Sequence, residues 1–273
     1  MEIECSNLFD IDKIVDYLKP LSYSLNSSYT WDTPANKEVL EAKEKGVFNS
    51  EQCNVLISET NMFERNVVLK KLLCKMLTDA SSPETKKVIF KWIVNKWGGI
   101  NVKNIDKIYA YVVNFLEQKS ISKKLDFDCI ASVTKVLSFI SPESYIIYDA
   151  RVAYSVNWIL LKTNASKMFF PMPESRNAKL NAIDISTLIR LSNVSNYSSN
   201  IGNSKIISNS DKKVFIGKTM AYINLCDLIM KVNSRLWEDD RKKYPFYTEM
   251  LIFSLADTNI FTDILNSCNF NIG

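Results

Sequence analysis

The sequence predicts an all-α protein. Apolar residues recur at the i, i+3, i+4 and i+7 positions through most of the chain, which is the period of one face of an α-helix. Alternating patterns typical of strands are short and isolated, as in KIIS at 205–208. With 47% hydrophobic residues, six glycines and seven prolines, the composition indicates a globular chain with few long linkers. The length of 273 residues suits one large domain or two modest ones.

The first half of the chain divides into helices at its prolines and glycines. Pro20 is expected to end the first helix, and the polar and aromatic stretch 21–34 is expected to be a loop. Gly46 and the pair Gly98-Gly99 mark later breaks. We predict helices over 8–19, 36–46, 50–58, 61–78, 83–97 and 103–118.

The second half continues the same pattern. A helix is expected to end at Ser141-Pro142, because proline disfavours the helical conformation of the residue before it, and the next helix is expected over 150–162. The stretch 164–179 is expected to be a loop, and the Ser- and Asn-rich tract 192–212 to be a long mobile loop. The last two helices are predicted near 212–236 and 245–266.

Several classes of protein and site are excluded by what the sequence lacks. No apolar run is long enough to span a bilayer, and the N-terminus is acidic where a signal peptide is basic, so we expect a soluble protein in the cytoplasm or at the nucleoid. The six cysteines form no Cys-x-x-Cys pair, so we expect reduced thiols and no metal site, and we assign no cofactor. Because the chain has no histidine, any catalysis must use Asp, Glu, Lys, Tyr or a thiolate.

The stretch from Asp128 to Trp158 carries the strongest local signal. It reads as a helix, a short connector and a second helix that begins at Asp149. A carboxylate at a helix start accepts hydrogen bonds from free backbone N–H groups and is favoured by the helix dipole. Asp149 is therefore either an ordinary N-cap or a cap that also serves a site.

Pro142 lies in the connector, Ile147 precedes Asp149, and Arg151 and Val152 follow it at the start of the second helix. This layout resembles the catalytic motif of the helix–hairpin–helix superfamily of DNA glycosylases. Lys135 stands where bifunctional members of that family carry a lysine. The Gly-x-Gly hairpin of the family is missing, and the separation between Lys135 and the aspartate is a few residues shorter than usual. The residues that carry the resemblance are Pro142, Ile147, Asp149, Arg151 and Val152.

The resemblance implies an enzyme that turns one nucleotide out of duplex DNA and hydrolyses its N-glycosidic bond. Asp149 would stabilise the sugar cation or activate water, and Lys135 would form a Schiff base with the sugar. Lys135 could equally be a phosphate contact or a surface lysine whose stem lies on apolar groups. The implied fold has two helical subdomains with a cleft between them, which we assign to 61–158 and to 1–60 plus 159–273.

The implied partner is double-stranded DNA with a flipped-out base, bound by a monomer. Residues 61–124 hold thirteen Lys or Arg and only five Asp or Glu, as a phosphate-binding face requires, although solvated helix faces also carry such charges. In this interpretation the turn 119–124 replaces the family's hairpin. The aromatic candidates for a base pocket are equally good core residues. The candidates for DNA binding are Lys91, Lys96, Lys119, Lys123, Lys124 and Arg151, and those for the base pocket are Tyr29, Trp31, Tyr148 and Trp158.

Two alternatives stay open at this stage. Glu249, in the apolar last helix, is interpreted as a core partner, although buried acids also occur at catalytic sites. The whole chain could be a non-catalytic helical module that binds nucleic acid or another protein. Within the enzyme hypothesis, the sequence does not distinguish repair of damaged bases from defence against base-modified phage DNA.

Overall fold

The protein is built from helices. The computed structural model describes residues 8–118, 123–198 and 202–268, and within these ranges it contains no strand, only an isolated bridge between Phe169 and Phe215. The all-α prediction is confirmed. No helix in these ranges is both long and apolar enough to cross a bilayer. The elements are α1 (Ile11–Ser22), α2 (Leu25–Ser28), α3 (Asn36–Glu44), α4 (Ser50–Ser58), α5 (Met62–Asp79), α6 (Pro83–Lys91), the π-helix η2 (Trp92–Trp97), α7 (Ile105–Glu117), α8 (Ile130–Ile140), α9 (Ala150–Thr163), α10 (Ala178–Ala182), α11 (Ile185–Ser192), α12 (Val194–Ser198), α13 (Ile206–Val214), α14 (Lys218–Leu236), the 3-10 helix η4 (Asp240–Lys243), α15 (Phe246–Leu255), the π-helix η5 (Ala256–Ile260) and α16 (Phe261–Ser267).

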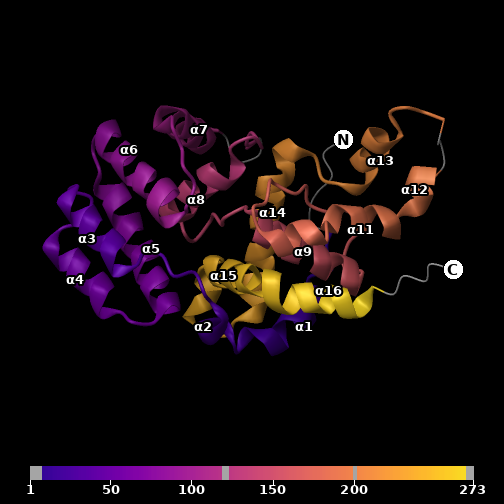
Figure 1. Ribbon diagram of the computed structural model, residues 1–273, viewed down its shortest axis with the longest axis horizontal. Helices are drawn as coiled ribbons and strands as arrows, with labels where there is room; N and C mark the ends of the chain where they lie inside the picture. Colours follow the sequence, from indigo (N-terminus) through magenta and orange to yellow (C-terminus); the bar gives the residue numbers. More distant parts are fainter. Residues whose placement is uncertain (1–7, 119–122, 199–201, 269–273) are drawn as a thin grey trace.

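The helices gather in two groups (Figure 1). In the first, α5 packs on α8, α7 packs on α6 and α8, and α4 packs between α3 and α5. In the second, α9 packs on α1 and α15, while α14 packs on the same two helices. The edges of the predicted subdomains differ from this packing, because α3 and α4 lie with α5 and α9 lies in the second group. The division into two subdomains stays a prediction.

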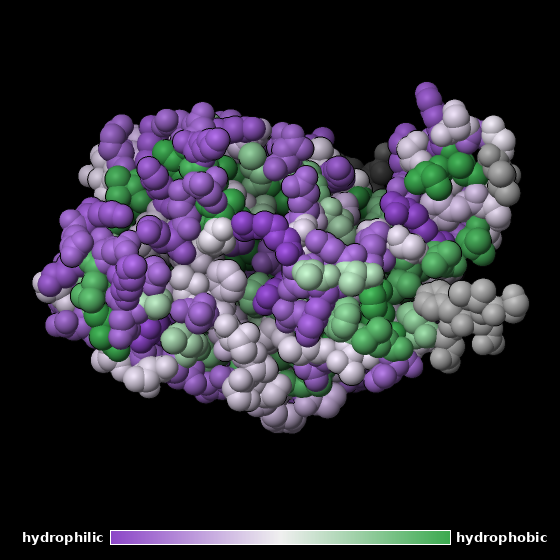
Figure 2. Space-filling model, viewed as in Figure 1, coloured by the Kyte–Doolittle hydropathy of each residue, from purple (hydrophilic) through white to green (hydrophobic). Residues whose placement is uncertain are grey.

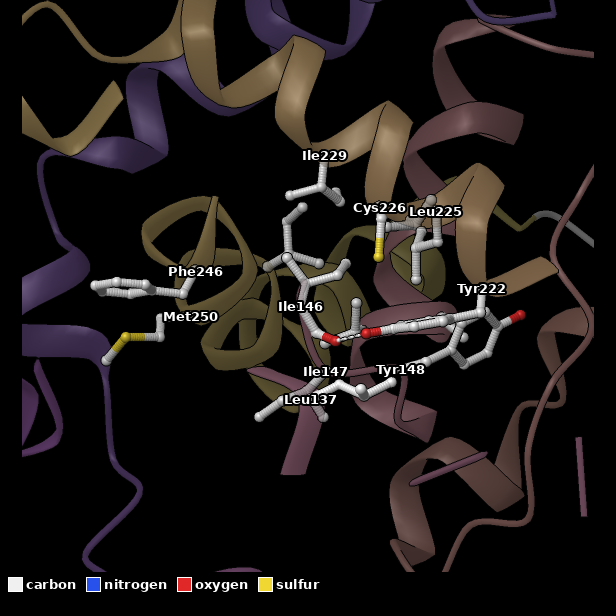
Figure 3. Close-up of a cluster of buried hydrophobic side chains, with 14 of the residues drawn as sticks. Leu137, Ile146, Ile147, Tyr148, Tyr222, Leu225, Cys226, Ile229, Phe246 and Met250 are labelled. Carbon is white, nitrogen blue, oxygen red and sulfur yellow. Dashed lines mark hydrogen bonds between the residues drawn. The ribbon is translucent and has the colours of Figure 1, made fainter. Parts of the chain in front are cut away.

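The connection between α8 and α9 is held by buried hydrogen bonds. The backbone N–H of Tyr148 donates to Thr134 Oγ1 on α8 at 3.0 Å, and the Tyr222 hydroxyl on α14 donates to the carbonyl of Ile146 at 3.0 Å. Figure 3 shows Ile146 and Ile147 enclosed by apolar side chains of α14 and α15. Because buried backbone groups need such partners, the start of α9 has a defined place in the fold.

Three local predictions are wrong. The first helix continues through Pro20 to Ser22, because its buried side, at Ile14, Leu18 and Ser22, is uninterrupted while Pro20 is exposed. The stretch 21–34 contains the short helix α2.

The polar tract 192–212 contains α12 and part of α13, and its residues 199–201 lie outside the described ranges. Asp211 accepts hydrogen bonds from the Arg190 guanidinium at 3.0 Å and from the Tyr197 hydroxyl at 2.8 Å. These tertiary bonds order a segment whose composition predicts a mobile loop.

Candidate functional site

Among the described residues four charged side chains are buried: Arg65, which donates to backbone carbonyls, and three on α5, α8 and α15 that act on one another. Lys70 is 2% exposed, Lys135 is 6% exposed and Glu249 is 3% exposed. Removing a charge from water is costly unless the charge is paired, so lysine and glutamate are seldom fully buried. Buried titratable groups that act on one another are candidates for a functional site.

Lys135 is the residue for which the sequence predicts a nucleophile. Its side chain lies against Gly98, where an added Cβ would be 2.7 Å from the lysine Cδ and 2.9 Å from its Cε. Its ammonium group has no hydrogen bond or ion pair with any described residue. Burial lowers the pKa of Lys135, the charges of Asp149 and Glu249 oppose this effect, and the charge of Arg176 adds to it.

Asp149 is the N-cap of α9, as the sequence predicts. Its Oδ1 accepts a hydrogen bond from the backbone N–H of Val152 at 2.9 Å. The half-buried carboxylate has no second partner within the described part of the chain. Its field acts on Lys135, Glu249 and the phenol of Tyr29. Asp149 is therefore both a helix cap and a charge that acts on the buried lysine.

Lys70 lies in an aromatic enclosure. Its Nζ donates to Ser138 Oγ at 3.2 Å and lies 4.6 Å from the ring centroid of Phe139, 5.5 Å from that of Phe246 and 5.9 Å from that of Trp97. Aromatic faces attract a cation and partly replace its lost hydration. Burial lowers the pKa of Lys70, and Glu249 opposes that effect.

Glu249 has little direct compensation for its burial. Its Oε2 accepts one long hydrogen bond, 3.5 Å, from the backbone N–H of Ile147, and it forms no ion pair with any described residue. Burial and the nearby Asp149 raise the pKa of Glu249 to about 7, although Lys70 and Lys135 act against that rise. Glu249 is thus a carboxyl group whose pKa, at about 7, lies near neutral pH.

Arg151 and two of the predicted base-pocket aromatics surround one ring. The Arg151 guanidinium forms an ion pair with Asp257 at 2.9 Å and lies 4.9 Å from the ring centroid of Phe253. The rings of Trp31 and Tyr29 lie 5.8 Å and 6.2 Å from the same ring. The indole N–H of Trp31 is buried and has no acceptor in the described ranges. The structure therefore brings Arg151, Trp31 and Tyr29 together.

Tyr148 and Trp158 lie elsewhere, in the core. The Tyr148 hydroxyl donates to the carbonyl of Pro171 at 2.7 Å, and the Trp158 indole donates to Asp263 at 2.8 Å. Both side chains are buried and their polar atoms are satisfied. No face of either ring is open to a base in this arrangement, and both residues match the core alternative that the sequence left open.

The predicted DNA-binding lysines near α6 differ in whether their ammonium groups already have a partner. Figure 2 shows that hydrophilic residues prevail on the surface over α5, α6 and α7. Lys91 and Lys124 are exposed, and neither ammonium group has a partner among the described residues. Lys96 is also exposed but forms an ion pair with Glu41 at 3.0 Å. Lys91 and Lys124 are thus the two predicted DNA-binding lysines whose ammonium groups are free among the described residues.

The basic stretch 61–124 is less basic at its surface than its composition indicates. Arg65 and Lys70 are buried, so neither contributes to a phosphate-binding face, and that part of the prediction is wrong. Lys123 is half-buried and donates to the Tyr145 hydroxyl at 2.7 Å. Lys119 lies outside the described residues.

Sequence reasoning missed Lys70, although a signal for it exists. Phe63, Asn66, Leu73 and Leu77 share the inward face of α5, and Lys70 occupies the middle of that three- and four-residue pattern. A lysine at such a position is expected to be buried. Lys135 packs closely on Gly98, one of the two glycines at which the sequence predicts a break, but the sequence carries no signal for that contact.

The comparisons with known proteins add no family. Neither a scan against protein-family models nor searches of curated proteins and of solved structures found a match to this chain. The function is therefore inferred from the site itself.

Proposed function

We propose that the protein is a DNA N-glycosylase in which Lys135 is the nucleophile and Asp149 stabilises the sugar cation. One observation carries this proposal: the Lys135 side chain is only 6% exposed and its ammonium has no hydrogen bond or ion pair with a described residue, while the carboxylate of Asp149 acts on it from the start of α9. A desolvated lysine loses its proton more readily and becomes a nucleophile. An unpaired buried lysine also has no structural bond that explains its presence.

The chemistry follows from these two groups. The Lys135 amine attacks C1′ of the flipped nucleotide, the N-glycosidic bond breaks, and its electron pair leaves with the base, which takes up a proton from water. A proton then moves from the attached nitrogen to the ring oxygen O4′ as the C1′–O4′ bond breaks, which yields the protonated Schiff base. The carboxylate of Asp149 stabilises positive charge on the sugar during bond cleavage. If water is the nucleophile instead, Asp149 is the group that activates it.

The implied architecture is that of two helical subdomains with a cleft between them, in a protein resembling the helix–hairpin–helix glycosylases. The grouping of α3–α8 apart from α9 and α14–α16 supports it. Figure 2 also shows a hollow near the middle of its face, where Figure 1 draws the connection between α8 and α9. Trp31, with its unpaired indole N–H, and Tyr29 are the aromatic candidates beside the base. The biological role is repair of damaged bases or defence against base-modified phage DNA.

The test is a panel of labelled duplexes, each carrying one damaged or enzymatically modified base. We expect release of base from at least one duplex, and a covalent protein–DNA adduct when borohydride is present. Lys135→Gln should form no adduct, and Asp149→Asn should release base far more slowly. Release without any adduct would assign the nucleophile to water. Binding without release from any duplex would instead favour the non-catalytic module.

A further inference from the structure

We propose that Glu249 and Lys70 are positioning residues that set the protonation of the Lys135 side chain, Glu249 by favouring its ammonium form and Lys70 by opposing it. The inference deepens the proposed function, since it names the groups that decide when Lys135 is a nucleophile. It stands on three buried charged side chains from three different helices. Within the described ranges, Lys70 bonds to one hydroxyl, Glu249 accepts one long bond from a backbone N–H, and the Lys135 ammonium bonds to neither kind of group.

Lys70 is connected to the helix that carries Lys135. Its Nζ donates to Ser138 Oγ, and that hydroxyl in turn donates to the backbone carbonyl of Lys135 at 2.8 Å. The aromatic rings of Phe139 and Phe246 hold the ammonium in place without neutralising it. A positive charge is therefore fixed beside α8 by contacts that do not involve the Lys135 side chain.

Glu249 belongs to a third helix, α15. Its one hydrogen bond, from the backbone N–H of Ile147, belongs to the connection that leads to Asp149. Its field acts on Lys70 and on Lys135. Glu249 forms no ion pair with any residue in the described ranges, so its charge is not neutralised by a direct partner.

Other charged and titratable groups also lie near Lys135 and Glu249. Asp149 and Arg176 act on Lys135 with opposite signs. Tyr29, Tyr222 and Cys226 also lie within reach of Glu249, and burial raises the pKa of each, so all three are neutral near pH 7. The charge of Lys135 lowers the pKa of Lys70, and because repulsion between two like charges is mutual, Lys70 also opposes the ammonium form of Lys135. Removing Glu249 and removing Lys70 should therefore have opposite consequences for Lys135.

A charge balance favours this arrangement. With both lysines protonated and both acids ionised, the site holds four charges, three of them buried. A proton that moves from Lys135 to Glu249 leaves the net charge unchanged, removes two buried charges and produces the neutral amine. Removing buried charges lowers the desolvation cost, so burial favours the neutral pair.

The experiment is a pH titration of the free protein by NMR, with lysine labelled with carbon-13 at Cε. The Lys135 signal is identified by its loss in Lys135→Gln. Compared with the wild type, Glu249→Gln should move the Lys135 midpoint to lower pH by about one pH unit or more, and Lys70→Met should move it to higher pH by a similar amount. Lys162→Gln, at the far end of α9, is the matched control and should leave it unchanged.

If Glu249 and Lys70 had only a structural role, the two substitutions would not move the Lys135 midpoint in opposite directions. Unchanged midpoints in both variants, or shifts of the same sign, would overturn the inference. If Glu249→Gln does not fold, Glu249→Asp retracts the charge by one methylene and should give a smaller shift to lower pH. Lys70→Gln serves in the same way for Lys70→Met.

The proposed function is tested separately from this inference, because the titration needs no DNA. A second measurement follows adduct formation against pH with a duplex carrying an abasic site. Its acidic limb should move with the NMR midpoint in each variant. If the midpoints shift in opposite directions but no protein forms an adduct at any pH, the positioning roles stand and the glycosylase function fails.

Discussion

The helix α9 has an aspartate and a lysine near each end, and the two pairs are built differently. At the C-terminal end, Asp263 of α16 accepts hydrogen bonds from the Trp158 indole at 2.8 Å and the Tyr17 hydroxyl at 2.9 Å. It also forms an ion pair with Lys162 at 3.3 Å. Burial alone would raise the pKa of Asp263, but these partners more than offset it, so the pKa lies below its ordinary value.

At the N-terminal end, the aspartate and the lysine have fewer bonding partners. Asp149 accepts one hydrogen bond, from the backbone of its own helix, and the ammonium of Lys135 has no bond to a described residue. Lys135 is nevertheless buried, whereas the Lys162 side chain is 40% exposed. The pair with the more buried lysine is therefore the less compensated one.

This difference separates a charge cluster that stabilises the fold from one that is available for chemistry. Buried polar groups in folded proteins are normally bonded, and the exceptions concentrate at functional sites. The end of α9 at Asp263 follows the rule, and the end at Asp149 departs from it. Three predictions compare the two ends and a fourth concerns lysines outside both, from the largest expected effect to the smallest.

The largest effect is expected for the two lysines. Lys135→Gln should abolish the borohydride-trapped adduct completely, because the adduct requires the amine as nucleophile. Lys162→Gln should form it at the wild-type rate. The measurement is gel quantification of a labelled duplex with an abasic site. Equal trapping by Lys135→Gln and the wild type would assign the nucleophile to another residue and remove the distinction between the two ends.

The two aspartates should differ in rate. Asp149→Asn should slow base release by roughly 10²-fold or more, since it removes one preorganised charge opposite a developing cation. Its melting temperature should be nearly unchanged, because asparagine caps helices about as well as aspartate. Single-turnover kinetics on the best substrate of the panel give the rate. Asp263→Asn is the matched control, and a comparable slowing there would contradict the assignment.

Stability should show the reverse order. Asp263→Ala leaves the Trp158 indole and the Tyr17 hydroxyl without their acceptor, at a cost of about 1–3 kcal/mol in the free energy of unfolding. Because folding lowers the pKa of Asp263, its contribution is present above the ordinary value of 3.8 and disappears as the pH falls through the lower folded value. Denaturant unfolding from about pH 6 to about pH 3 should therefore show the difference from the wild type shrinking with acid.

The smallest effect is expected for exposed lysines that belong to neither end. Lys91→Ala and Lys124→Ala should each weaken DNA binding modestly and equally for all sequences, and lower the slope of log affinity against log salt by about one. Fluorescence anisotropy at several salt concentrations measures that slope. Binding that does not depend on salt in the wild type would remove DNA phosphates as the ligand.

The positions of most helices could be predicted from the sequence because their signals are local. The start of α9 at Asp149, the Pro83 start of α6 and the break after Trp97 depend on residues a few places apart, and these predictions are confirmed. The errors at Pro20 and in the tract around Asp211 arose where distant contacts outweighed local preference.

The sequence by itself determined the all-α class, the connection from α8 to α9 and the cap at Asp149. Only the tertiary structure decided which charges are buried. Lys70 meets Ser138, 68 positions away, and Glu249 meets the backbone of Ile147, 102 positions away. Helical periodicity reports which face of a helix is apolar, but it carries no information about which distant groups desolvate a lysine there, and desolvation together with neighbouring charges decides whether that lysine is a surface cation or a nucleophile.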